Sequence, residues 1–341
     1  MKLFGRNIIK SIICTAIAAV QGIAFTACDS IIYNDLDPCP EGLRLRFVYD
    51  YNMEFANAFY SQVDCLTLHV YDKDGNHVAT RTETARDLLS DENWRMTLDL
   101  PAGEYNLIAY GGMACTQSSF AYSTVPSTGA KMQDINVFLK PESITQPNGT
   151  KLHDLFYGNL NITIPEASDD YTEATVEMMK DTNNLRIVLQ HLSGRPVNHE
   201  DFTYTLTADN TRLDHANDVV STGITTYNPW ATGNVLAGIN GFDGSDVQAA
   251  YAEFSTSRFI HGAEPRLTIC RASDGRQVVS IPLVNYLLML KSQEFADMES
   301  QEFLDRESRW KMVFFLDEGN TWINTQIVIN DWVVRINDTE L

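Results

Sequence analysis

The chain has 341 residues, of which 44% are hydrophobic and 21% charged, and this much apolar material excludes a wholly disordered protein and suits two domains. Its 45 acidic residues outnumber the 25 lysines and arginines and give a formal net charge of −20. Such a surface repels phosphate backbones and anionic lipid headgroups, so nucleic-acid binding and membrane attachment through a basic patch are both disfavoured.

The N-terminus has the features of a secretion signal. The first ten residues are basic, and residues 11–27 carry no charged side chain. Cys28 follows this run directly, and a small residue before a cysteine at such a point is typical of a lipobox, in which the cysteine carries the lipid after cleavage. We therefore predict a lipoprotein signal peptide over residues 1–27, lipid attachment at Cys28 and a tether over residues 28–40.

Two alternatives for this segment remain open. It could be an uncleaved membrane anchor, although 17 uncharged residues lie at the short limit for crossing ~30 Å of hydrocarbon. It could also be an ordinary signal peptide with an unmodified Cys28, since Phe25 stands where a lipobox usually has leucine. Lipid attachment is the interpretation that the order of basic start, apolar run and cysteine favours.

The remaining cysteines make disulfides possible in an exported chain. The predicted cleavage removes Cys14 and leaves Cys39, Cys65, Cys115 and Cys270, and four cysteines allow three pairings. Cys65 falls on the polar face of its predicted strand, where it can meet a partner outside the apolar core. No two cysteines have the C-x-x-C spacing, so zinc ribbons and thioredoxin-like redox sites have no support.

The first part of the chain after the tether alternates apolar and polar residues with period two, which indicates half-buried strands. The predicted strands cover residues 43–49, 63–71, 96–100, 105–110 and 135–139. The turn at 72–76 contains Asp-Gly and predicts a hairpin. Strands 96–100 and 105–110 are expected to form a second hairpin, and strand 135–139 is expected to close this set.

Residues 141–151 are turn-formers without periodicity, so we expect a linker there. Strands resume at 160–164, 175–179, 185–189 and 202–207. Two further hairpins are predicted, from 266–271 to 277–281 and from 312–316 to 322–329, each around a glycine-containing turn. Many short strands joined by tight turns are typical of β-sandwiches or barrels and argue against alternating β and α units.

One stretch departs from this pattern. Apolar residues between 285 and 309 recur at spacings of three and four, which predicts one or two amphipathic helices inserted in the second domain. We expect their apolar face to pack on the core; binding of a partner protein is the alternative. A shorter helix is expected over residues 53–59.

The sequence holds little that points to catalysis or metal binding. It has no H-E-x-x-H, G-x-S-x-G or phosphate-loop motif. Residues 72–76 are similar to part of a calcium loop, but that alignment puts Val70 and Arg81 at ligand positions, and neither binds calcium. Acidic pairs such as Asp305 and Glu307 are expected by chance among 45 acids. We predict no enzyme, cofactor or metal site.

Several segments, in their order along the chain, resemble the FimB-type fimbrial anchor proteins, the fimbrillin-associated anchor lipoproteins of Bacteroidota. LDLPAGEY at 98–105 and NNLRIVLQ at 183–190 are examples. The others are residues 28–40, 43–53, 66–75, 153–158, 301–306 and 329–332. The resemblance covers essentially the whole chain after the signal peptide.

The resemblance implies a mainly β fold with two transthyretin-like β-sandwich domains in tandem, over residues 41–142 and 152–341, and the helical insertion in the second. It further implies a surface-exposed lipoprotein of the outer membrane at the base of a fimbria, which tethers the fimbrial stalk and influences its length. The expected partners are a fimbrillin stalk subunit, joined by β-strand addition, and the membrane, through the lipid. Strands within 322–336 are the candidate contact.

The alternative function is a glycan- or ligand-binding surface lipoprotein. Trp94, Trp230 and Trp310 could line a platform for a sugar, although burial in the core is the more ordinary role of such tryptophans. An acidic secreted hydrolase is the third possibility, and it lacks a motif.

Overall fold

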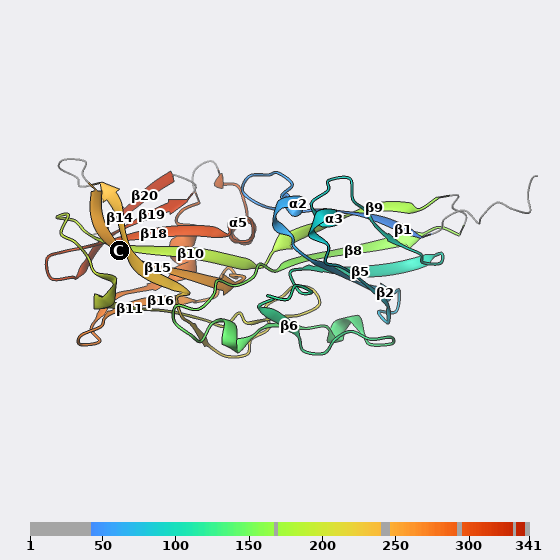
Figure 1. Cartoon of the computed structure of the whole chain (residues 1–341), viewed down its shortest axis with the longest axis horizontal. Coiled ribbons are helices and arrows are strands. Elements are labelled where there is room, and N and C mark those ends of the chain that lie inside the picture. The colour runs from blue at the N-terminus through green and yellow to red at the C-terminus, as the bar shows by residue number, and fades with distance from the viewer. Residues whose placement is uncertain (1–41, 167–169, 240–245, 292–294, 330–331, 338–341) are drawn as a thin grey trace, which may run out of the picture.

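The structure is a computed structural model that describes residues 42–166, 170–239, 246–291, 295–329 and 332–337, and its fold is mainly β, as predicted (Figure 1). The N-terminal strands lie at one end of its long axis and the C-terminal strands at the other. The strands are β1 (Leu43–Val48), β2 (Leu66–Asp72), β3 (His77–Glu83), β4 (Met96–Leu98), β5 (Gly103–Gly111), β6 (Phe120–Tyr122), β7 (Val137–Leu139), β8 (Phe156–Ile164), β9 (Thr172–Lys180), β10 (Thr182–His191), β11 (Phe202–Ala208), β12 (Arg212–Leu213), β13 (Thr225–Tyr227), β14 (Ala231–Ile239), β15 (Asp246–Ser257), β16 (Arg266–Arg271), β17 (Gln277–Pro282), β18 (Arg309–Leu316), β19 (Trp322–Ile329) and β20 (Trp332–Asn337). The helices are α2 (Phe59–Gln62), α3 (Arg86–Leu89), α4 (Leu283–Leu288) and α5 (Ser300–Arg306), with short 3-10 turns η1 (Met132–Asp134), η2 (Pro141–Ser143) and η3 (His199–Asp201).

The N-terminal strands form two facing layers with the order β3-β2-β5-β8-β9-β1-β4. β9 pairs in parallel with all of β1, but with β8 only over its last three residues, so the sheet folds over at β9. The apolar positions of each strand share one face because side chains alternate along a strand. Phe47 of β1, Leu68 of β2 and Leu107 of β5 therefore meet in one buried core between the layers.

The turn between β2 and β3 is the predicted hairpin, and the predicted second hairpin is wrong. In the β2–β3 turn, Gly75 has φ +74°, and Asp72 Oδ1 accepts the N–H groups of Asp74 and Asn76 at 2.9 and 2.8 Å. β4 pairs with β1, whereas β5 pairs with β2 and β8, so the chain crosses from one layer to the other between β4 and β5. Turn residues signal that a chain reverses, but not which strand it then joins.

The outer face of β2 and β5 is covered as well. The chain between residues 112 and 139 folds back over it, and β6 and β7 form a three-stranded sheet with β12. Tyr122 of β6 contacts the 1% exposed His69 of β2, with 2.9 Å between the hydroxyl and Nε2. The strand predicted at 63–71 is present as β2, but it is buried on both faces rather than half-buried, because this segment covers its polar face. The prediction that 135–139 closes the first sheet is wrong, because β7 pairs with β6 and β12 instead.

The C-terminal strands form a six-stranded sheet with the order β14-β15-β10-β18-β19-β20 and a four-stranded sheet with the order β13-β11-β16-β17. The predicted hairpins β16–β17 and β18–β19 are both present. Ile187 of β10, Met312 of β18, Leu206 of β11 and Ile269 of β16 are buried in one core. That core continues to Tyr110 on the outer face of β5, so the two ends of the molecule share apolar packing.

The strand pairing changes from the N-terminal to the C-terminal sheets at the step from β9 to β10. β8 and β9 hydrogen-bond with the N-terminal strands, and Asp181 alone separates β9 from β10. The sequence prediction drew the boundary earlier, at the linker 141–151, where the structure has η2 followed by turns. In the structure, the chain therefore passes this linker and returns to the first sheet before it enters the second.

Two short helices, α4 and α5, lie in the predicted helical insertion, and their apolar residues, including Leu287, Phe303 and Leu304, are buried in the core. The helix predicted at 53–59 is wrong. The Asn52 amide there donates to the carbonyls of Tyr49 and Ala56, and Phe55 has φ +50°, so this segment is a turn and α2 begins only after it.

A disulfide joins Cys65 to Cys115, across 50 positions of sequence. Cys115 lies in the segment that covers the outer face of β2, which is the face on which Cys65 was expected. Cys270 is a free thiol, and Cys39 lies outside the described residues. Among the described residues, the helices are all too short or too polar to cross a membrane.

Candidate functional site

The predicted lipid-bearing Cys28, the signal peptide and the tether lie outside the described residues. The described chain starts just before β1, and β1 begins at the end of the long axis that faces away from the C-terminal sheets (Figure 1). Strands β18, β19 and β20 lie at the opposite end. The start of the folded chain and the predicted contact region 322–336 are thus well separated.

The contact region forms an edge of the six-stranded sheet. β20 pairs with β19 from Asn324↔Asn337 to Ile329↔Trp332, and no described strand pairs with its other side. An edge strand carries unpaired N–H and C=O groups that a further strand can bind. Among the other edges, β3 is rich in exposed polar residues and β17 ends in Pro282, which has no N–H to offer. β14 is the second edge of the same six-stranded sheet.

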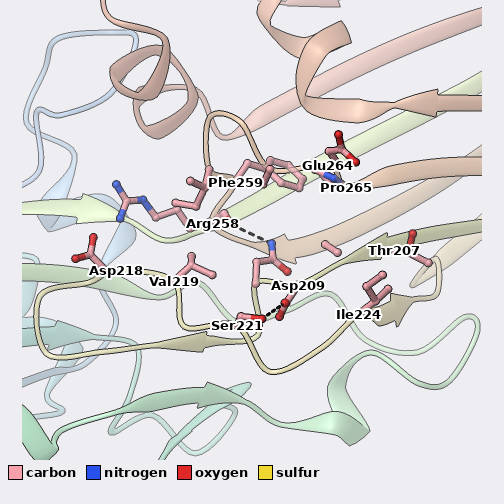
Figure 2. Close-up of a pocket in the computed structure, with 14 residues that line it drawn as sticks. Thr207, Asp209, Asp218, Val219, Ser221, Ile224, Arg258, Phe259, Glu264 and Pro265 are labelled. Atoms are coloured by element: carbon pink, nitrogen blue, oxygen red, sulfur yellow. Dashed lines mark hydrogen bonds between the residues drawn. The ribbon is translucent and has the colours of Figure 1, made fainter.

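A pocket of about 590 Å³ lies between two loops of the C-terminal sheets (Figure 2). The first loop, residues 209–224, connects β11 through β12 to β13, and the second, residues 258–265, connects β15 to β16. Phe259 and Pro265 form buried parts of its wall, while Ile224 stands at the rim with 80% of its surface exposed. We call this the loop pocket.

Asp209 shapes the first loop. Its carboxylate accepts the N–H groups of Thr222 and Gly223 at 2.8 and 3.1 Å and the hydroxyl of Ser221, as Figure 2 shows for the serine. These hydrogen bonds hold the pKa of Asp209 below its usual range, and the bond from Ser221 has the largest effect. The carboxylate therefore stays charged. Gly223 has φ +101°, a conformation that favours glycine, and the chain then projects Ile224 outward.

A buried polar group lies behind the pocket. Arg258 donates through Nε and a terminal nitrogen to both carboxylate oxygens of Asp305, at 2.7 and 2.8 Å, and through the other to the Asn217 carbonyl at 2.7 Å. The Asn217 amide donates to Asp181 at 2.8 Å. These four residues, the junction network, join both pocket loops to α5 and to the step between β9 and β10.

Charge within the junction network is unevenly stabilised. Burial raises the pKa of Asp181 to about 7, with Arg258 acting in the opposite direction. Burial alone would lower the pKa of Arg258, but the hydrogen-bonded Asp305 carboxylate more than offsets it and keeps that pKa above its usual value. Asp181 Oδ2 and Asn217 Oδ1 are buried without a hydrogen-bond partner. The network therefore holds one well-matched ion pair beside an aspartate with too few donors.

A second contact joins the two ends of the molecule. The guanidinium of Arg306, on α5, lies over the rings of Tyr51 and Phe55, 4.1 and 4.9 Å from their centroids. Its Nε donates to Glu302 at 2.7 Å on the same helix. Because both rings belong to the turn after β1, this contact attaches the N-terminal layers to the C-terminal helices.

The tryptophans of the alternative function do not form a common platform. Trp310 is 2% exposed and donates to Asn183 in the core. Trp94 stacks on Phe47 beside β4, and Trp230 precedes β14. Within the described part of the chain, histidines, cysteines and acids do not gather in threes as metal ligands. Asp305, considered as one of a catalytic pair, is held by Arg258.

Sequence reasoning missed both the loop pocket and the junction network. The polar residues 255–257 directly before Arg258 give no local signal that this arginine has a partner in the interior. The identity of that partner was not readable, because Asp305 lies 47 residues away.

The chain is similar to known fimbrial anchor proteins along most of its length. The family model described as fimbrillin-A associated anchor proteins Mfa1 and Mfa2 matches residues 36–338. The minor fimbrium anchoring subunit Mfa2 of Porphyromonas gingivalis is 22% identical over 332 residues, which cover 96% of this chain and 95% of that protein. Its solved structure matches with a TM-score of 0.65, over 87% of this chain and 99% of that one, at 16% identity.

Two crystal structures from Bacteroides thetaiotaomicron are more similar. One, described as a candidate adhesin, is 51% identical with a TM-score of 0.82, and the match covers 89% of this chain and all of that one. The other, described as a candidate polysaccharide-binding protein, is 28% identical with a TM-score of 0.74, over 88% of this chain and all of that one.

Proposed function

The chain belongs to the family of fimbrillin-A associated anchor proteins, and on this premise we propose that it is the anchor subunit at the base of a fimbria. A lipid on Cys28 holds it to the outer membrane, facing outward, and the other end of the molecule holds the fimbrial stalk. The family match along nearly the whole chain carries the proposal, because an association with fimbrial subunits is the property from which the family takes its name.

The arrangement of the fold supports a tether. A chain attached at Cys28 enters the structure at β1, and the open edge of β20 lies toward the other end of the long axis. An anchor between a membrane and a filament needs its two attachments apart, so that the filament clears the surface. The anchor's position at the filament base also gives it a part in setting the length of the fimbria.

The stalk joins by β-strand addition at β20. An extended segment of the first fimbrillin pairs with the outer N–H and C=O groups of this strand and continues the six-stranded sheet. Main-chain pairing of this kind supplies affinity without any pocket for a ligand, which agrees with a sequence poor in catalytic motifs.

Replacement of Cys28 tests the lipid tether. In cells carrying Cys28→Ala, we expect fimbriae to be shed into the medium, while Cys270→Ala, which changes a thiol of the folded part, leaves them attached. The amounts of fimbrillin on washed cells and in the medium are compared by immunoblotting. Fimbriae that stay attached to the Cys28→Ala cells would refute the lipid tether.

A pair of adjacent proline substitutions tests the edge. Neighbouring residues of a strand direct their N–H groups to opposite sides, so Val333→Pro and Val334→Pro remove one bond to β19 and one outward group. One variant should lose thermal stability, and the other should fold normally but fail to retain fimbrillin in a pull-down. Normal retention by both variants would exclude β20 as the docking edge.

The second candidate function is glycan binding, favoured by the 28% identical relative described as a candidate polysaccharide-binding protein. A glycan array on the purified protein separates the two functions. Two results together would favour this second function: binding of the purified protein to a defined glycan, and fimbriae that stay attached to the Cys28→Ala cells.

A further inference from the structure

The loop pocket offers a binding site distinct from the β20 edge. It opens beside β11 and the end of β15, and three strands, β10, β18 and β19, separate β15 from β20 in the sheet. Its volume of about 590 Å³ falls within the range of about 300–1,000 Å³ that ligand sites occupy. The pocket therefore has room for several side chains of a partner.

The pocket combines an apolar interior with an acidic rim. Phe259, Ile260 and Val219 contribute apolar wall, and the exposed Ile224 adds a bulky side chain that folding leaves in water. An exposed β-branched side chain at the mouth of an apolar pocket gains favourable burial only when something binds there.

The charges at the rim are acidic. Asp209, Asp218 and Glu264 line the pocket, and Figure 2 shows Glu264 and Asp218 on opposite sides of it. The one arginine, Arg258, directs its guanidinium to Asp305, so its charge is already matched. The pocket thus presents negative charge on a chain whose net charge is −20, which favours a cationic ligand.

We infer that the loop pocket binds an extended segment of a partner protein in which a bulky apolar side chain is flanked by lysine or arginine. The apolar side chain packs against Ile224 and the half-buried Val219 and Ile260. The basic side chains pair with Glu264 and Asp218. Anionic ligands are repelled by this rim. A sugar is disfavoured because the one aromatic ring of the pocket, Phe259, is only 1% exposed and offers no stacking face.

The test uses the chain from Asp29 to Leu341 and a fluorescent nine-residue peptide of alternating lysine and leucine. Anisotropy at low salt should show saturable binding. Ile224→Ser should weaken it about tenfold through lost apolar contact, and Glu264→Gln about threefold, an effect that disappears at high salt. Both residues are exposed, so neither substitution removes a core contact.

Two matched controls separate the pocket from general attraction. Leu236→Ser removes an apolar side chain of β14 that is 70% exposed, and Glu92→Gln removes an exposed acid from the N-terminal layers. Both should bind the peptide as the unmodified protein does. Equal losses in the controls, no binding at millimolar peptide, or binding of a neutral oligosaccharide that Ile224→Ser abolishes would overturn the inference. Attachment of fimbriae does not enter this measurement, so its result is independent of the anchor role.

Discussion

Asp181 is the residue whose replacement tests the junction network most directly. It is fully buried at the step between β9 and β10, and its pKa is raised from 3.8 to about 7 by burial. An acid whose pKa is higher in the folded than in the unfolded protein binds protons preferentially in the folded state, so stability falls as the pH rises between the two values. Three pKa units correspond to about 4 kcal/mol above pH 7.

Asp181→Asn should remove this cost. The new amide can supply an N–H where Asp181 Oδ2 and Asn217 Oδ1 now have no partner. We expect the variant to be more stable than the unmodified protein at pH 8 by up to about 4 kcal/mol, and by only about 2 kcal/mol at pH 5, where the folded aspartate is already protonated.

Urea unfolding at pH 5 and pH 8, followed by tryptophan fluorescence, measures both differences. The exposed Asp87→Asn on α3 is the control, with an expected change within about 0.5 kcal/mol. A less stable Asp181→Asn at pH 8, or the same difference at both pH values, would show that Asp181 is stabilised as a charged group and would refute the reasoning.

Three other variants test contacts across the molecule. Asp305→Asn leaves the largely buried Arg258 without its hydrogen-bonded counter-charge and should cost about 3–5 kcal/mol in urea unfolding. A loss below about 1 kcal/mol would mean that solvent compensates the charge of the arginine. Replacing Cys65 and Cys115 with alanine opens a loop of 50 positions and should cost about 4 kcal/mol, seen as a lower midpoint that reducing agent no longer changes. Arg306→Ala removes both ring contacts and should lower the free energy of unfolding by about 1–2 kcal/mol. Amide hydrogen exchange in residues 50–58 should become faster, and unchanged exchange would contradict the attachment of this turn to α5.

The strands were predictable from the sequence, and their partners were not. The alternation of Leu43, Leu45 and Phe47 is a local pattern set by a strand with one face on a core, and the structure has β1 at that place. The parallel pairing of β1 with β9 joins residues more than 120 positions apart, and no local pattern encodes it. The same limit explains the wrong second hairpin, since its turn specified a reversal only.

The candidate site was likewise predictable from the sequence only in part. The edge at β20 follows a hairpin that turn residues and alternation predict, although its place at the end of the sheet needed the fold. The loop pocket and the junction network depend on Arg258 meeting Asp305 and Asn217, which come from two distant segments. Such side chains look like ordinary surface charges in the sequence until packing buries them.

The proposed attachments give the strand order a mechanical meaning. With the tether at the start of β1 and the stalk at β20, tension pulls β1 toward one end and the C-terminal sheets toward the other. β1 and β9 run in parallel along this direction, so their six residue pairs are loaded together rather than opened one at a time. β9 continues through Asp181 into β10, an inner strand of the six-stranded sheet, and the load then crosses β18 and β19 to the edge. A structure loaded in this order resists force through whole ladders of hydrogen bonds, which is the property that an anchor requires and a catalyst does not.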